Sequence, residues 1–382
     1  MARLLVLEAP TPLDIGMHDV PPRPFEPSLI FLGDCDGPAE TLLEEMAQAA
    51  APGLRRIFSH CRDFGDDTDL LAWMRAHEQR PSANYVNWIG RTVRQVRDEH
   101  ALQQALRQQL EAEPPNAAEA DPLLLHERLL SFVQTERAAG RLPLSPPEPT
   151  PRSWRRRNLA HRIGVPLAAL ALAPLLLLAS PVLALMLRRR EKTDPDYAPT
   201  PDPAHRRATA ALEDHDVTNA FTVFGDLKPG RFRRWTTQAL LVLLDYASRH
   251  IYGRGYLTRV QTIHFARWVF LDDRRRLFFA SNYDGSLDSY MDDFINKVAW
   301  GINLVFSNGV GYPRSNWLIG GSAHDERKYK RVLHRHQLVT DVWYKAYPGL
   351  TALDLQRNSA IRRGVERTGM SDREVREWLA LL

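Results

Sequence analysis

The stretch Leu277-Phe-Phe-Ala-Ser-Asn-Tyr-Asp-Gly285 decides the fold, because a strand-forming run ends in a turn and leads into an amphipathic helix. Aromatic and apolar residues favour a strand up to Tyr283, and Asp284-Gly285 is typical of a turn. Ser286 is a suitable N-cap for a helix over residues 287–299, where apolar residues recur at three-four spacing. Another aromatic-rich strand is expected over 262–271. This order predicts one half of a ferredoxin-like fold.

A similar stretch, Leu29-Ile-Phe-Leu-Gly-Asp-Cys-Asp-Gly37, occurs 248 residues earlier (277 − 29 = 248). A second match, between Tyr85 and Tyr344, has an offset of 259 (344 − 85 = 259), so the later copy has a longer loop. Ordered matches of this kind are typical of an internal repeat. They predict an α+β fold in which two ferredoxin-like repeats, over residues 1–112 and 216–382, pack as an α/β barrel.

A hydrophobic insert separates the two repeats. Residues 165–187 carry no charge, and this length is sufficient to cross a bilayer. Arginines lie on both sides, so the positive-inside rule gives no direction. Pro174 lies near the centre and would break a helix, which makes a re-entrant hairpin an alternative to a single span. Because both repeats must lie on one side to pack together, we favour the hairpin, with Val165, Pro174 and Leu187 as its membrane residues.

Two linkers flank the insert. Residues 113–164 are expected to form a helical and then proline-rich, basic linker, and residues 188–215 a proline-rich one. Further on, residues 231–250 combine a basic start with an apolar middle. That pattern fits either a helix at the membrane interface or a helix packed on the barrel.

Composition narrows the class of protein. The net charge is +4, and much of the basic excess adjoins the insert, which favours anionic lipid headgroups over nucleic acid as the partner. Two cysteines in 382 residues indicate a reducing compartment. The N-terminus has no signal-peptide pattern, so we expect the cell membrane, with cytoplasmic soluble domains. Zincin, P-loop, Gly-x-Ser-x-Gly and Cys-x-x-Cys patterns are missing, which disfavours conventional zinc enzymes, kinases and hydrolases.

The polar residues of the second repeat form the candidate site. An imidazole, a guanidinium and a carboxylate that converge can bind ligands or transfer protons. The candidate catalytic residues are His264, Arg267 and Asp284, and the candidate ligand-binding residues are Asn282, Asn308, His336 and Tyr344. Each candidate also has a structural interpretation. His264 could be a core histidine, Arg267 part of an ion pair and Asp284 a turn residue. His334 and His336 could belong to a solvated run of charges. The first repeat does not keep the set, since Asp34 replaces Asn282 and His60 replaces Asn308.

Three motifs carry a resemblance to known proteins. They are Thr262-Ile-His-Phe-Ala-Arg-Trp268, Ser281-Asn-Tyr-Asp-Gly-Ser286 and Val342-Trp-Tyr-Lys-Ala-Tyr-Pro348. Residues 216–370 resemble a family of uncharacterised bacterial membrane-associated proteins without an established activity. More distantly, the double-repeat plan resembles the dimeric α/β-barrel superfamily, which includes dye-decolourising peroxidases and chlorite dismutase-like haem proteins. That second resemblance implies haem as the cofactor, with His334 or His336 as the axial ligand and Arg267 and Asp284 beside it.

Three functions remain open at this point. The first is a membrane-anchored barrel that binds or transforms a small or lipid-like molecule. The second is a haem-dependent, peroxidase-like oxidoreductase, and the third is a non-catalytic membrane scaffold. The sequence leaves the ligand, the oligomeric state and the presence of catalysis undecided.

Overall fold

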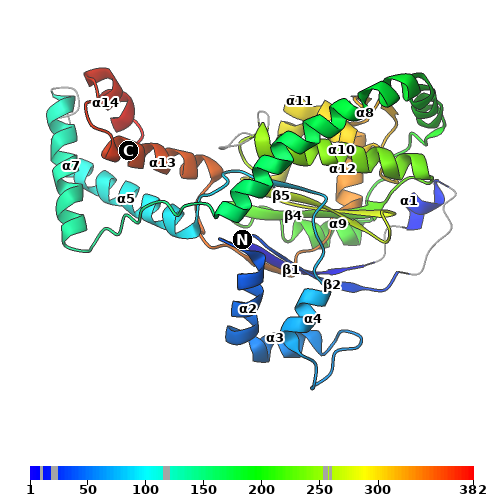
Figure 1. Cartoon of the computed structure of the whole chain (residues 1–382), viewed down its shortest axis with the longest axis horizontal. Coiled ribbons are helices and arrows are strands. Elements are labelled where there is room, and N and C mark those ends of the chain that lie inside the picture. Colours follow the sequence, from blue (N-terminus) through cyan, green and yellow to red (C-terminus); the bar gives the residue numbers. More distant parts are fainter. Residues whose placement is uncertain (9–11, 19–24, 115–120, 253–256, 258–259) are drawn as a thin grey trace.

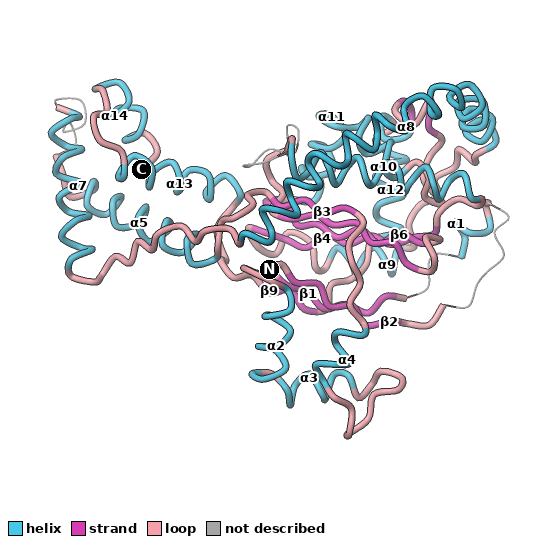
Figure 2. Tube along the Cα trace, in the orientation of Figure 1, coloured by secondary structure: helices cyan, strands magenta, loops and turns pink. Residues whose placement is uncertain are grey.

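The computed structural model describes residues 1–382 except 9–11, 19–24, 115–120, 253–256 and 258–259. It is a mixed α+β structure in which two antiparallel sheets lie one above the other, with helices around them (Figures 1 and 2). The expected α+β class is therefore confirmed. Within the described residues these sheets are open, and no closed barrel is seen.

The larger sheet has the strand order β3-β5-β6-β4. Its strands are β3 (Ala83–Val86), β4 (Thr218–Asp226), β5 (Phe265–Leu271) and β6 (Arg276–Asp284). Every residue of β6 is buried, as expected for a central strand covered on both faces. β6 begins and ends one residue outside the predicted strand, whereas β5 begins three residues later than predicted.

The smaller sheet has the order β2-β1-β9, from β1 (Ala2–Leu7), β2 (Ser28–Gly33) and β9 (Val342–Tyr344). Leu5 and Leu7 of this sheet pack against Phe224 and Phe278 of the larger one, so apolar side chains fill the space between the sheets. Figure 2 shows the strands of the two sheets as two stacked layers.

Each sheet contains a short strand from the other of the two predicted repeats. β3 comes from the first repeat but pairs with β5, and β9 comes from the second repeat but pairs with β1. Residues 1–112 and 216–382 are therefore joined by strand pairing within each sheet. A short last strand gains most of its hydrogen bonds and packing from whichever sheet edge lies closest, and sequence repetition does not specify that edge.

The pairing register repeats with the offsets that the sequence shows. Arg3 pairs with Leu32 and Arg267 with Ala280, and 280 − 32 = 248. Across the exchanged strands, Trp343 pairs with Arg3 and Asn84 with Arg267, and 343 − 84 = 259. The two exchanges are thus reciprocal, and Arg3 and Arg267 occupy equivalent positions in the two repeats.

Helices cover the outer face of the larger sheet. They are α10 (Arg231–His250), α11 (Leu287–Phe306) and α12 (Glu326–His336). α10 contributes Leu241 and α11 contributes Met291 and Ile302 to the main apolar core of the protein. α10 is therefore packed on the sheet, which is one of its two expected positions. α11 runs seven residues beyond the predicted end, with a non-helical backbone at Val298 inside it.

The remaining helices form two smaller groups with cores of their own. One group, at the left of Figure 1, is built from α5 (Val93–Glu111), α7 (Pro122–Ala138), α13 (Ala352–Glu366) and α14 (Asp372–Leu379). The other, below the smaller sheet, is built from α2 (Ala39–Ala49), α3 (Ala51–Phe58) and α4 (Leu70–Ala76). Shorter elements are α1 (Pro12–Gly16), α9 (Pro203–Ala210), the 3-10 turn η1 (Ser322–His324), β7 (Ser315–Asn316) and β8 (Gly320–Gly321).

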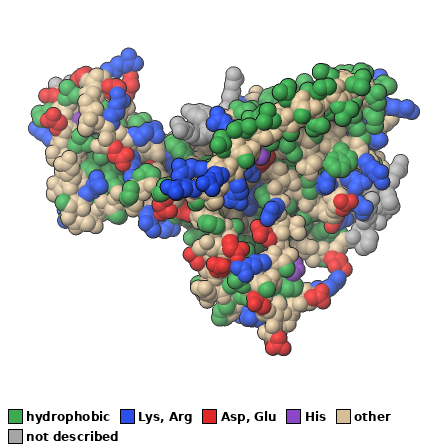
Figure 3. Space-filling model, viewed as in Figure 1, with side chains coloured by type: hydrophobic (Ala, Val, Ile, Leu, Met, Phe, Trp, Pro, Cys, Tyr) green, Lys and Arg blue, Asp and Glu red, His purple; other side chains and the backbone are tan. Residues whose placement is uncertain are grey.

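The hydrophobic insert lies within one continuous helix, α8 (Arg152–Thr193). The expected break at Pro174 is wrong, because the helix continues through that residue. Leucine and alanine favour the helix on both sides of each proline, so the prolines distort it without ending it. Of the helices that the structure describes, α8 alone is long and apolar enough to cross a membrane, and none of its most apolar stretch is buried. Figure 3 shows its apolar side chains as an exposed band.

Candidate functional site

His264 and Asp284, two of the three candidate catalytic residues, meet in a buried network. The Nε2 atom of His264 lies 2.9 Å from Oδ1 of Asp284, and the Thr218 hydroxyl donates to the same oxygen at 2.8 Å. The backbone N–H of Ala352 donates to Oδ2 at 2.7 Å, and the Tyr347 hydroxyl lies 3.4 Å from Nδ1 of His264. Protein groups therefore occupy both carboxylate oxygens and both ring nitrogens. Burial raises the pKa of the Tyr347 hydroxyl, which makes this phenol a poor acid.

The first repeat contains an equivalent of the Asp284 contact. Oδ2 of Asp36 accepts a hydrogen bond of 2.7 Å from the N–H of Val93, the first residue of α5. Asp284 makes the same bond to the first residue of α13, and the offsets match (284 − 36 = 248; 352 − 93 = 259). A carboxylate near a helix N-terminus is stabilising. Asp36 in the first repeat and Asp284 in the second therefore each orient a helix, which is a structural role.

Arg267 lies in a different set of contacts from His264 and Asp284. Its guanidinium forms an ion pair with Asp34 and donates to the Gly33 carbonyl at 3.4 Å. Its equivalent, Arg3, donates to the Ser281 carbonyl at 2.7 Å, and 281 − 33 = 248. Each arginine thus binds the neighbouring sheet at equivalent carbonyls. The structure brings His264 and Asp284 together, whereas Arg267 lies apart from them and joins the two sheets.

The candidate ligand-binding residues are also dispersed. The Asn282 side chain accepts hydrogen bonds from the N–H groups of His264 and Phe265, which fixes the start of β5. The Asn308 side chain accepts a bond of 3.1 Å from Arg233. Tyr344 lies on β9 and is exposed. These residues do not face a common cavity.

His336, one of the two candidate haem ligands, is held by protein groups. Its Nδ1 atom lies 2.9 Å from the Phe224 carbonyl, and its Nε2 atom lies 3.0 Å from a carboxylate oxygen of Asp14. Burial alone would raise the pKa of Asp14, but hydrogen bonding to His336 and Arg335 lowers it below its ordinary value. Neither ring nitrogen of His336 is directed at open space, so its surroundings do not fit an axial ligand.

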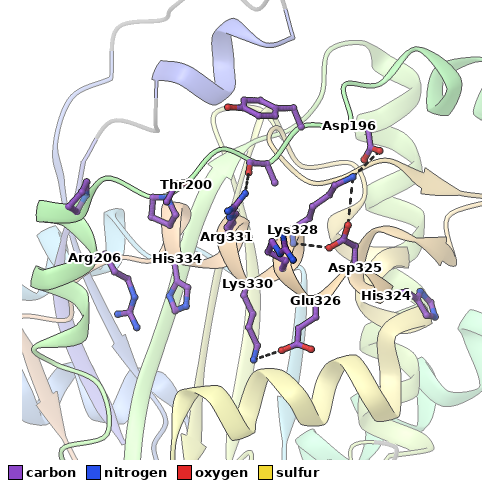
Figure 4. Close-up of a pocket in the computed structure, with 15 residues that line it drawn as sticks. Asp196, Thr200, Arg206, His324, Asp325, Glu326, Lys328, Lys330, Arg331 and His334 are labelled. Atoms are coloured by element: carbon purple, nitrogen blue, oxygen red, sulfur yellow. Dashed lines mark hydrogen bonds and ion pairs between the residues drawn. The ribbon is translucent and has the colours of Figure 1, made fainter.

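His334, the other candidate haem ligand, lines a wide polar groove between residues 196–203 and α12, shown in Figure 4. Two lysines of this groove pair with acids: Lys328 pairs with Asp196 at 3.0 Å and Lys330 with Glu326 at 2.8 Å. Arg267 and Asp284 do not line it. The groove around His334 therefore lacks the two distal partners that the haem interpretation proposes.

An apolar cavity of about 240 Å³ lies between α10, α11 and the outer face of the larger sheet. Among the residues that the structure describes, none with a charged or amide side chain lines it. Residues that line it include Leu244, Trp268, Phe279, Phe294, Val298 and Gly301. The Trp268 side chain is buried, and its indole N–H finds no hydrogen-bond partner within the described residues. A buried donor without a partner is costly.

Sequence reasoning missed this cavity. Its walls come from residues 221 to 333, and each segment has the pattern of an ordinary core helix or strand. The one available signal was Gly301, a glycine within a helix with open space beside it. The sequence pairs it with Gly53, and such a glycine marks a position where a side chain is missing from the packing.

Comparison with family models, curated proteins and solved structures gave no match to this chain.

Proposed function

We propose that this protein is a membrane-attached binding protein for a small, largely apolar molecule, held in the cavity between α10, α11 and the larger sheet. The observation that carries the proposal is the apolar cavity itself, which is lined in part by the Trp268 side chain, whose buried indole N–H has no partner within the described residues. Apolar pockets with a few placed polar groups are the usual form of ligand sites. The exposed apolar surface of α8 supports attachment to a bilayer.

The size and chemistry of the cavity limit the ligand. Its volume of about 240 Å³ is below the roughly 300–1,000 Å³ typical of sites for drug-sized ligands. It therefore suits one hydrocarbon chain or a small ring system and excludes a whole phospholipid. The Trp268 N–H calls for a carbonyl or ether oxygen. A short fatty-acid ester satisfies both requirements.

The fold that we propose for this function is a pair of ferredoxin-like repeats arranged as a dimeric α/β barrel within one chain. The recurrence of the offsets in strand register, arginine contacts and helix-capping aspartates supports it. The likeness to uncharacterised bacterial membrane-associated proteins belongs to the same proposal. We place the soluble parts in the cytoplasm, in keeping with the two free cysteines.

A matched pair of variants tests the ligand site. Gly301→Leu fills the cavity, whereas Gly53→Leu places the same side chain on α3, where the space beside the glycine is also open. We expect a brominated short-chain fatty-acid ester to quench tryptophan fluorescence in the wild type and in the Gly53→Leu variant. Gly301→Leu should abolish the quenching. Trp268→Phe should weaken ester affinity by roughly two- to tenfold, the worth of one hydrogen bond.

A second candidate function is a non-catalytic membrane scaffold. The filled interface between the sheets and the structural contacts of Arg267 and Asp284 favour it. The same titration separates the two functions. Equal quenching in the Gly301→Leu and Gly53→Leu variants, or none in any protein, would leave the scaffold as the better account.

A further inference from the structure

The N-terminal end of the apolar stretch of α8 is attached to the C-terminal end of α10. Nδ1 of His161 lies 2.9 Å from Nε2 of His250, and the same ring lies 3.5 Å from a carboxylate oxygen of Asp245. The Tyr246 hydroxyl donates to the Arg162 carbonyl at 3.3 Å. We call the residues 161–162 the N-terminal foot of α8.

The C-terminal end of the stretch is attached to the opposite end of α10 and to residues 315–318. Glu191 is completely buried and accepts hydrogen bonds from Ser315 and from the N–H groups of Trp317 and Leu318, at 2.8 to 3.1 Å. The Arg190 guanidinium lies 5.6 Å from the ring centre of Phe232, near the start of α10. Residues 190–194 form the C-terminal foot.

Asp194 completes this foot. Its Oδ2 atom accepts from Lys228 at 2.9 Å and from Arg233 at 2.6 Å, and the cationic side chains are both almost fully buried. Breaking a buried ion pair leaves an uncompensated charge, which is strongly unfavourable. The C-terminal foot therefore stays on the folded domain.

The two feet are closer together than the helix between them is long. From residue 161 to residue 190, a straight helix would measure about 44 Å, at about 1.5 Å per residue. The matching contacts on α10, from residue 232 to residue 250, are about 27 Å apart by the same rise. α8 must therefore bow away from the domain, and Pro166, Pro174 and Pro181 allow it to bend. Figure 1 shows α8 crossing the molecule and turning at its far end.

The middle of the bent helix, residues 165–187, is apolar and faces away from the protein. We call these residues the crest. Leu170, Leu177 and Leu185 are at least 70 % exposed and Leu178 is 81 % exposed, in a stretch without charges. A helix satisfies its own backbone hydrogen bonds, so it can enter lipid without a partner. Arg155–Arg157 before the crest and Arg188–Arg190 after it place positive charge where anionic headgroups would lie.

We propose that α8 inserts its apolar crest into one leaflet as an arch, and that both feet and the whole folded domain stay on one face of the bilayer. A transmembrane span would place residues 161 and 191 on opposite sides of about 30 Å of hydrocarbon. That arrangement would remove Glu191 and Asp194, or His161, from the domain that binds them. The inference rests on the membrane attachment in the proposed function and specifies its topology.

Single cysteines test the arch in right-side-out and inverted membrane vesicles. Cys35 and Cys61 are replaced by serine, and Ser153→Cys, Thr193→Cys and Leu177→Cys are then introduced one at a time. Ser153 and Thr193 are exposed positions outside the crest. With a membrane-impermeant maleimide, we expect both outer positions to react from the same face, and position 177 to react only after detergent is added.

The outcomes separate failure of the arch from failure of the attachment. Labelling of positions 153 and 193 from opposite faces would overturn the arch and leave membrane attachment intact. Reaction of position 177 without detergent, with the protein recovered in the soluble fraction, would overturn both.

A flotation assay tests which surface meets the lipid. Leu178→Glu places a charge at the crest, and Leu353→Glu places the same charge at an exposed leucine on α13. With vesicles that contain anionic phosphatidylglycerol, we expect Leu178→Glu to lower the partition coefficient about a hundredfold. Leu353→Glu should leave it unchanged. Equal behaviour of the two variants would show that α8 is not the inserted surface.

Discussion

The buried ion pairs of Asp194 lead to the sharpest prediction on stability. Asp194→Asn keeps the size of the side chain but removes the charge that Lys228 and Arg233 share. Because both cations are almost fully buried, we expect a loss of about 3–5 kcal/mol in the free energy of unfolding. Asp196→Asn is the matched control. Asp196 pairs with Lys328, and both are much more exposed, so we expect a loss of about 0–1 kcal/mol.

Urea unfolding in mild detergent, followed by circular dichroism, measures both variants. The pH adds a second test. Burial lowers the pKa of Lys228 to about 8, although Asp194 opposes this effect. In Asp194→Asn the pKa of Lys228 falls further. Lys228 of the folded variant therefore loses its proton, and with it the cost of a buried charge, at a lower pH than in the wild type. The stability gap to wild type should therefore narrow as the pH rises towards 8. Equal losses in the two variants would refute the reasoning.

Two further predictions concern other parts of the chain. In Gly364→Ala, the new Cβ would clash with the Trp378 ring, so we expect a loss of about 1–3 kcal/mol by urea unfolding. Gly53→Ala, in open space, should instead stabilise its helix. Burial beside Lys228 lowers the pKa of His18 to about 4. Between about pH 6.5 and 4 the unfolded chain therefore binds more protons than the folded one, so the stability of the fold decreases as the pH falls. In thermal unfolding, His18→Gln should lose less stability over this pH range than the wild type. A pH profile identical to that of the wild type would contradict this assignment.

Local pattern was enough to locate the strand and turn of 277–285, the start of the following helix and the offset between the repeats. Local pattern was insufficient to predict which strands pair with each other. β3 and β5 are separated by almost 180 residues, and tertiary packing brings them together. Neither strand's own sequence indicates this partner. Proline chemistry also predicted a break in the insert, because a rule for isolated prolines overlooks the strong helix preference of the leucines and alanines around them.

The candidate site was predicted less well than the fold. His264, Arg267 and Asp284 drew attention because an imidazole, a guanidinium and a carboxylate can serve acid–base chemistry, but the same groups also make structural contacts. The decisive information was the comparison with Arg3 and Asp36, and the meaning of those residues depends on which atoms they meet across the sheets. The apolar cavity left no signal beyond one glycine, because a wall of a cavity and a wall of a core have the same composition.

The reciprocal exchange of β3 and β9 has a consequence for the synthesis of the chain. During translation, β1 and β2 emerge first, but the edge of β1 must wait for β9, which is more than 330 residues away. The first repeat therefore cannot close its sheet until almost the whole chain has left the ribosome. Through that interval an open strand edge and the apolar crest of α8 are both exposed, which are the conditions under which nascent chains aggregate or recruit chaperones.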